Sequence, residues 1–130
     1  MAQFSMIPER QRILGAIPDY AVAISPASRK VTVKSHGRTI AESTRALLVE
    51  ETRHADVYYL PREDVDFSLL TRTDHSTYCP FKGYASYWTL QVDGAEEANV
   101  VWSYEDPYPE VTGLKDYVSF YTNRVDVSTT

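Results

Sequence analysis

The segment Ser86-Tyr87-Trp88-Thr89-Leu90-Gln91-Val92-Asp93 decides the fold class, because apolar and polar side chains alternate along most of it. Successive side chains of a β-strand point to opposite faces, so this spacing predicts a strand. Trp88, Leu90 and Val92 share one face, and Tyr87 lies with the polar residues on the other. We therefore expect Trp88 in the core.

Short β-rich runs recur on both sides of this segment. Gly37 and Gly94 supply the conformations that tight turns need, and Pro61 ends one run because proline cannot donate to a ladder. Rossmann alternation and phosphate-binding glycine fingerprints are missing. The pattern predicts a mainly β protein, an antiparallel sandwich or half-open barrel. The other predicted strands cover residues 21–24, 31–34, 39–42, 46–51, 57–60 and 99–104.

The two ends of the chain have different patterns. Residues 1–20 have no clean period, and Pro8 and Pro18 leave room for only one or two helical turns, so we treat them as an N-terminal arm. Residues 21–130 are predicted to form a single β domain. Near its end an apolar stripe has helical spacing, which predicts one C-terminal helix. Its residues are Leu114, Tyr117, Val118, Tyr121 and Val125.

Composition limits the classes of partner. The 130 residues are 43% hydrophobic, enough for one domain with a core, and they include one cysteine. The absence of a secretory pattern and of a bilayer-length apolar run predicts a cytoplasmic protein. A net charge of −5 argues against nucleic-acid or membrane binding. The segment from Arg29 to Lys82 has nine Lys/Arg and eight Asp/Glu, whereas the segment from Tyr84 to Thr130 has two Lys/Arg and eight Asp/Glu. We therefore expect an anion to bind to the middle of the chain.

The candidate site centres on the stretch Thr73–Trp88, which concentrates titratable and aromatic side chains around a turn at Pro80 and Gly83. Cys79 is a candidate nucleophile, since Lys82 would favour its thiolate. The competing interpretation is that Cys79 is a small buried hydrophobe. Both interpretations stay open.

Other candidate residues come from separate motifs. Lys82 is the main candidate for binding an anion, with Arg62 and Arg45 as partners, and each can equally be an exposed surface charge. His54 and His75 are candidate acid–base groups because histidine titrates near neutrality. The aromatic side chains that would stack on a planar ligand are Tyr59, Tyr87, Trp102 and Tyr104.

Four motifs together resemble domain-of-unknown-function family four-two-seven. They are Ile40–Leu47, Val57–Val65, Cys79–Trp88 and Trp102–Pro107, and the similarity covers about Val31 to Val127. The resemblance implies a small tent-like β domain that is sometimes labelled nucleotidyltransferase-like. One cysteine rules out the four-thiolate zinc site of several tent-like folds, and the chain's adjacent acidic pairs would point to opposite faces of a strand.

We therefore expect a small-ligand-binding β domain with a polar, aromatic-lined pocket in which Lys82 and Arg62 meet an anionic group. Whether it acts as an enzyme on a nucleotide or phosphorylated metabolite stays open, as do the cofactor and the oligomeric state. The alternatives are a protein-interaction or structural module without catalysis and a thiol enzyme using Cys79.

Overall fold

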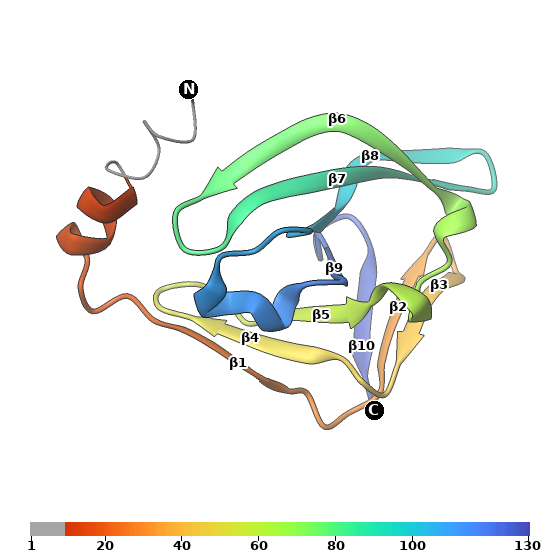
Figure 1. Cartoon of the computed structure of the whole chain (residues 1–130). Helices are drawn as coiled ribbons and strands as arrows, with labels where there is room; N and C mark the ends of the chain where they lie inside the picture. The colour runs from red at the N-terminus through yellow and green to blue at the C-terminus, as the bar shows by residue number, and fades with distance from the viewer. Residues whose placement is uncertain (1–9) are drawn as a thin grey trace.

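Two antiparallel sheets build the protein (Figure 1). The computed structural model describes residues 10–130. One sheet has seven strands in the order β1-β4-β5-β9-β8-β7-β6, and the other has three in the order β10-β2-β3. The strands are β1 (Val22–Pro26), β2 (Val31–Ser35), β3 (Arg38–Ser43), β4 (Leu47–Glu51), β5 (Val57–Pro61), β6 (Leu70–Cys79), β7 (Gly83–Val92), β8 (Ala95–Ser103), β9 (Tyr117–Phe120) and β10 (Asp126–Thr129).

The seven-stranded sheet folds back on itself like a tent. Strands β1, β4 and β5 form a first arm, strands β8, β7 and β6 form a second arm, and β9 joins them (Figure 1). The short strand β9 makes two register pairs with β5 and two with β8. The arrangement is open, which confirms the predicted half-open, mainly β class.

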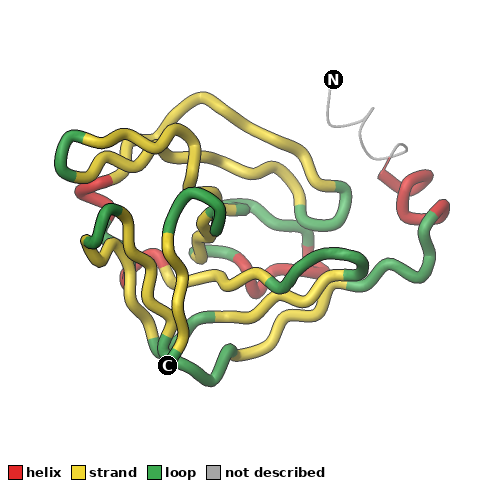
Figure 2. Tube along the Cα trace, turned by 180° about the vertical axis from the view of Figure 1, so that it is seen from behind, coloured by secondary structure: helices red, strands yellow, loops and turns green. Residues whose placement is uncertain are grey.

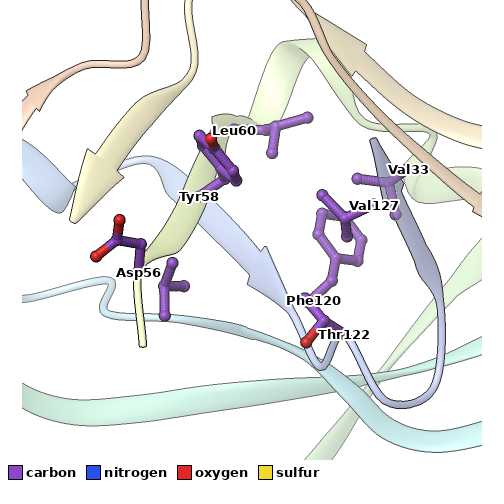
Figure 3. A pocket seen from close by; sticks show the side chains of 8 residues that line it. Val33, Asp56, Tyr58, Leu60, Phe120, Thr122 and Val127 are labelled. Atoms are coloured by element: carbon purple, nitrogen blue, oxygen red, sulfur yellow. The ribbon is translucent and has the colours of Figure 1, made fainter. Parts of the chain in front are cut away.

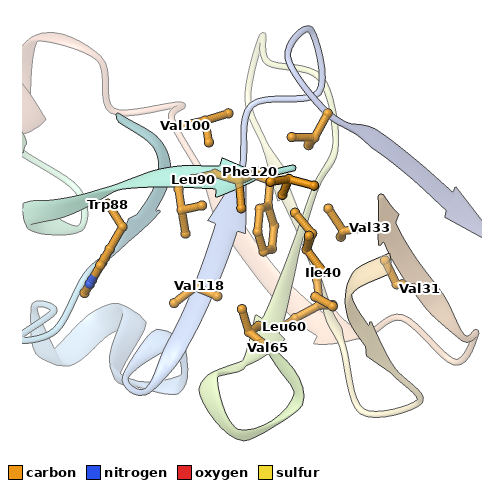
Figure 4. Close-up of a cluster of buried hydrophobic side chains, with 14 of the residues drawn as sticks. Val31, Val33, Ile40, Leu60, Val65, Trp88, Leu90, Val100, Val118 and Phe120 are labelled. Atoms are coloured by element: carbon orange, nitrogen blue, oxygen red, sulfur yellow. The ribbon is translucent and has the colours of Figure 1, made fainter. Parts of the chain in front are cut away.

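The hydrophobic residues form two clusters, one on each side of the folded sheet. The first lies between the seven-stranded and three-stranded sheets and contains Val33, Leu60, Trp88 and Phe120 (Figure 4). Trp88 is therefore in the core, as predicted. The second cluster lies between the two arms and contains Val49, Tyr59, Ala85, Tyr87, Tyr104, Val111 and Leu114.

The predicted turns at the two glycines are present. His36 and Gly37 both have positive φ between β2 and β3, and so do Asp93 and Gly94 between β7 and β8. Such pairs match the right-handed twist of the strands that they connect. The Pro61–Val65 turn contains the 3₁₀ helix η1 (Arg62–Asp64), and η2 (Phe67–Leu69) leads into β6.

The predicted C-terminal helix is wrong. Residues 109–114 form the 3₁₀ helix η3 (Pro109–Leu114), and Asp116, with φ +66°, turns the chain into β9. Tyr117-Val118-Ser119-Phe120 is β-rich, and sheet pairing on both sides outweighs its helical spacing. Leu114, Val118 and Val125 are buried, but from three different local structures.

Strands β6, β9 and β10 were not predicted as strands, and a short helix lies at the other end of the chain. Strand β6 is an edge strand whose side chains are mostly exposed, so it has no apolar alternation to detect. A helix over residues 10–16 lies at the outer side of the molecule, beyond the strands (Figure 2). In the described part of the chain, no helix is long and apolar enough to cross a bilayer.

Candidate functional site

A pocket of about 370 Å³ opens between the two arms of the folded sheet. Residues of β4 and β5 line it from the first arm, and residues of β7, β8 and the β6–β7 turn line it from the second arm. The β4–β5 loop and the segment after β9 complete it. The lining side chains are Val49, Glu51, His54, Ala55, Asp56, Val57, Tyr59, Lys82, Tyr87, Trp102, Tyr104, Phe120, Tyr121 and Thr122.

An ion pair between Lys82 and Glu51 joins the two arms inside this pocket. Their side chains are only 8% and 12% exposed, and the Lys82 Nζ atom lies 2.5 Å from Glu51 Oε1. The β6–β7 turn directs the lysine inward: Lys82 N–H donates to the carbonyl of Cys79, and Gly83 has φ +117°. The Lys82 carbonyl in turn accepts from Tyr108 N–H.

The second oxygen of Glu51 accepts a hydrogen bond from the Tyr20 hydroxyl. Burial alone would raise the pKa of Glu51, but the hydrogen bonds from Lys82 and Tyr20 outweigh it and hold that pKa below its ordinary value. Burial and the hydrogen bond to Glu51 raise the pKa of Tyr20. At neutral pH Glu51 is therefore a carboxylate and the Tyr20 phenol is protonated.

Aromatic side chains form the walls. Trp102 Nε1–H donates to the Tyr59 hydroxyl at 3.1 Å across the two arms, and their rings meet edge to face. The Tyr87 hydroxyl lies 2.9 Å from Thr77 Oγ1 and 3.4 Å from the Tyr121 hydroxyl. Burial raises the pKa of Tyr59 and that of Tyr104, so both phenols stay neutral.

The N-terminal segment packs against the same turn that holds Lys82. The Tyr20 ring stacks on Phe81 with ring centroids 3.9 Å apart. Arg10 donates from Nε to the Pro80 carbonyl at 2.5 Å and stacks over the Tyr108 ring. Residues 10–20 therefore contact their own domain, and Tyr20 belongs to the site.

Six of the predicted site residues line the pocket. The sequence places them in separate motifs, and the folding of one sheet brings them together. His54 lies at the β4–β5 loop, where Nδ1 is 2.9 Å from the Thr52 carbonyl and 3.3 Å from the Tyr20 hydroxyl. His75 lies outside the lining, with its ring packed on Tyr87 at 4.5 Å. The six are His54, Tyr59, Lys82, Tyr87, Trp102 and Tyr104.

The structure does not bring the two predicted arginine partners to Lys82. Arg62 lies on η1, where its guanidinium packs on the rings of Phe67 and Trp88 and pairs with Glu105 at 3.2 Å. Arg45 is exposed and pairs with two acidic residues of η1. Neither arginine lines the pocket between the arms.

Cys79 lies beside the pocket rather than in its lining. It ends β6, is half-buried and packs against the hydrophobic cluster between the arms. This position fits the packing interpretation, in which the thiol acts as a small hydrophobe. The nucleophile interpretation stays an untested prediction.

Sequence reasoning missed Glu51 and Tyr20. A signal for Glu51 existed, since it follows Leu47 and Val49 at two-residue spacing and so continues their face of β4. A charge at the third position of an inward face indicates a buried partner. Tyr20 gave no such signal, because the N-terminal segment that contains it has no hydrophobic periodicity from which an inward face could be predicted.

The model of the family described as Domain of unknown function (DUF427) matches residues 23–130. The chain belongs to this family. The resemblance that the four motifs indicate is therefore confirmed, and the family model's name, NTP_transf_9, agrees with the nucleotidyltransferase-like label. A comparison with curated proteins found no match.

The nucleotidyltransferase label of DUF427 implies a metal ion held by carboxylates against a triphosphate. The donor set of the described residues does not fit such an ion, because no three His, Cys, Asp or Glu side chains gather within residues 10–130. The pocket's buried carboxylate, Glu51, is already bonded to Lys82 and Tyr20. We therefore derive no metal-dependent step for this site.

Proposed function

We propose that the pocket binds a small anionic ligand through Lys82. The observation that supports this most is the hydrogen bonding of the Lys82 ammonium, which has three N–H donors. Within residues 10–130 it donates to one side chain, Glu51, and it faces the Tyr104 ring at 5.9 Å. Donors that remain on a buried cation, in a pocket, are available to an anionic oxygen.

The walls favour a ligand with a flat section. Trp102 packs on Tyr121 at 4.6 Å between ring centroids, and both rings line the pocket beside Tyr87. Aromatic faces stack on a base or a planar ring, and the phenol hydroxyls orient it. A nucleotide or a phosphorylated metabolite combines such a section with an anionic group. The proposal covers ligand binding only, and it places the protein in the cytosol.

The alternative of a protein-docking module has less support. Among the described residues, the large hydrophobic side chains that are strongly exposed are Tyr84 and Tyr121, at 53% and 41%. Tyr121 belongs to the pocket rim, so the two do not form a broad apolar patch. A concave site between the arms is the more developed feature.

A thermal-shift screen tests the proposal. The screen covers inorganic phosphate, nucleotides, sugar phosphates and small carboxylates, with and without Mg²⁺, on the native chain and on Lys82→Met. At about 100 times its dissociation constant a ligand adds roughly 2.7 kcal/mol, which corresponds to a rise in Tm of roughly 10 °C.

The comparison uses each variant's own unliganded Tm, because Lys82→Met also changes stability. Lys115→Met, at an exposed lysine, is the matched control and keeps the ligand-induced shift. The proposal is wrong if no compound stabilises the native chain, or if Lys82→Met retains the whole shift.

A further inference from the structure

A second pocket, of about 150 Å³, lies between the seven-stranded and three-stranded sheets (Figure 3). Its walls are mainly apolar and come from β2, β5, β9 and β10. Val33, Leu60 and Phe120 are buried, and Val127 and Tyr58 are partly covered. Apolar side chains that line an open pocket leave water and gain contacts when an apolar group enters it, so its occupation by such a group is favourable.

This apolar pocket is adjacent to the polar pocket between the arms. Four residues line both of them: Asp56, Val57, Phe120 and Thr122. Val57 precedes Tyr58 and Tyr59 on β5, so the strand presents Tyr59 to the polar pocket and Tyr58 to the apolar one. The two pockets therefore meet at these four residues.

We infer that the two pockets accept one amphipathic acid, whose anionic head binds Lys82 and whose apolar arm enters the pocket between the sheets. This inference rests on the proposed function, and it adds the ligand class. A cavity of about 150 Å³ is the size that accommodates a benzene-like group, so the arm is a short alkyl chain or a small ring.

The charges that line the two pockets set the direction in which the ligand binds. Asp56 lines both pockets, whereas Lys82 lines only the polar one. A carboxylate at the boundary repels an anionic head, and Lys82 attracts it. Apolar side chains in the second pocket would offer a charged head no partner, and burying it there would be costly.

Alkyl phosphates of increasing length test the inference. Methyl, butyl and hexyl phosphate are titrated into the full native chain, and binding is followed by two-dimensional amide NMR. If the arm enters the apolar pocket, affinity increases by about three- to fourfold for each added methylene until the pocket is full. The longer compounds, unlike methyl phosphate, then shift the amide signals of Val33 and Val127.

Two variants locate the head and the arm. Lys82→Met removes the binding of all three phosphates, whereas Val127→Phe fills the second pocket and removes only the gain with chain length. The titration of the three alkyl phosphates into the native chain needs no variant. It therefore tests whether the apolar arm binds even if Val127→Phe does not fold.

The outcomes separate the two claims. Equal affinities for all three phosphates, lost in Lys82→Met, would leave the proposed function standing and overturn the amphipathic ligand. Hexyl phosphate that binds beside Val127 independently of Lys82 would overturn the single-ligand inference. If none of the three binds, both the phosphate-head ligand and the inference fail.

Discussion

The Lys82 Nζ atom and the Glu51 Oε1 atom lie 2.5 Å apart, although Lys82 belongs to the turn of one arm and Glu51 ends a strand of the other. The contact therefore joins the two arms through a charged pair inside the pocket. Breaking such a pair leaves one charge without its partner in a covered site, which costs more than the pair contributes.

A double-mutant cycle on this pair should show strong coupling. We expect Lys82→Met to lower the free energy of unfolding by about 2–4 kcal/mol, because Glu51 keeps its charge and loses the ammonium. Glu51→Gln should lower the free energy of unfolding by less. The loss in the double variant should be smaller than the sum of the two single losses by at least about 1 kcal/mol. Urea unfolding measures all four proteins, and simple additivity would show that the pair is not coupled.

Stability should depend on Glu51 in acid. Its folded-state pKa is lowered, so its contribution is fully present above the ordinary glutamate pKa of about 4.3 and is lost as pH falls through the lower folded-state value. Glu51→Gln should therefore lose less stability than the native chain as the pH falls from the ordinary glutamate value through the folded-state value. Glu50→Gln, on the exposed face of the same strand, is the control and should follow the native curve.

Tyr20→Phe tests the contribution of the N-terminal segment. The substitution removes the hydroxyl that donates to Glu51 but keeps the ring on Phe81, so a loss of about 1 kcal/mol is expected. The pKa of Glu51 should rise, which carbon NMR of the side-chain carboxylate measures. Tyr84→Phe, at an exposed ring, should change neither quantity. An unchanged Glu51 pKa in Tyr20→Phe would remove Tyr20 from the site.

Gly83→Ala should disturb the turn that points Lys82 inward. Gly83 has φ +117°, and an added Cβ would lie 3.3 Å from the Asp106 carbonyl oxygen. We expect a loss of more than about 1 kcal/mol in the free energy of unfolding. Gly113→Ala is the matched control, because nothing lies within 4 Å of its Cβ position and its φ is not positive. Equal effects of the two substitutions would contradict this role of Gly83.

The parts of the fold that could be predicted are those in which a strand has an inward face. Trp88, Leu90 and Val92 specify one face of β7 by alternation, and all three are buried. Strand β6 lacks such a face because it is held mainly by backbone pairing with β7 at the sheet edge. The stripe from Leu114 to Val125 matched a helix by spacing alone, and β9 within it is only four residues long, too short to show the two-residue period of a strand.

The site was partly predictable for a related reason. Lys82 and Tyr87 belong to one dense stretch, so local composition was enough to single them out. Arg62 was grouped with them because of its charge, yet its direction depends on η1, which no local pattern reveals. The pairing of Lys82 with Glu51 is a property of the topology, since 31 residues separate them.

The shortness of β9 gives the molecule a seam. The two arms are joined there by four residues, and the hydroxyls of Ser119 and Ser103 add bonds to the carbonyls of Tyr58 and Tyr117. Any rotation about this seam changes the spacing of Tyr59 and Trp102 across the pocket. A ligand in the pocket that contacts both arms would restrict this rotation, so filling the pocket would also stiffen the whole sheet.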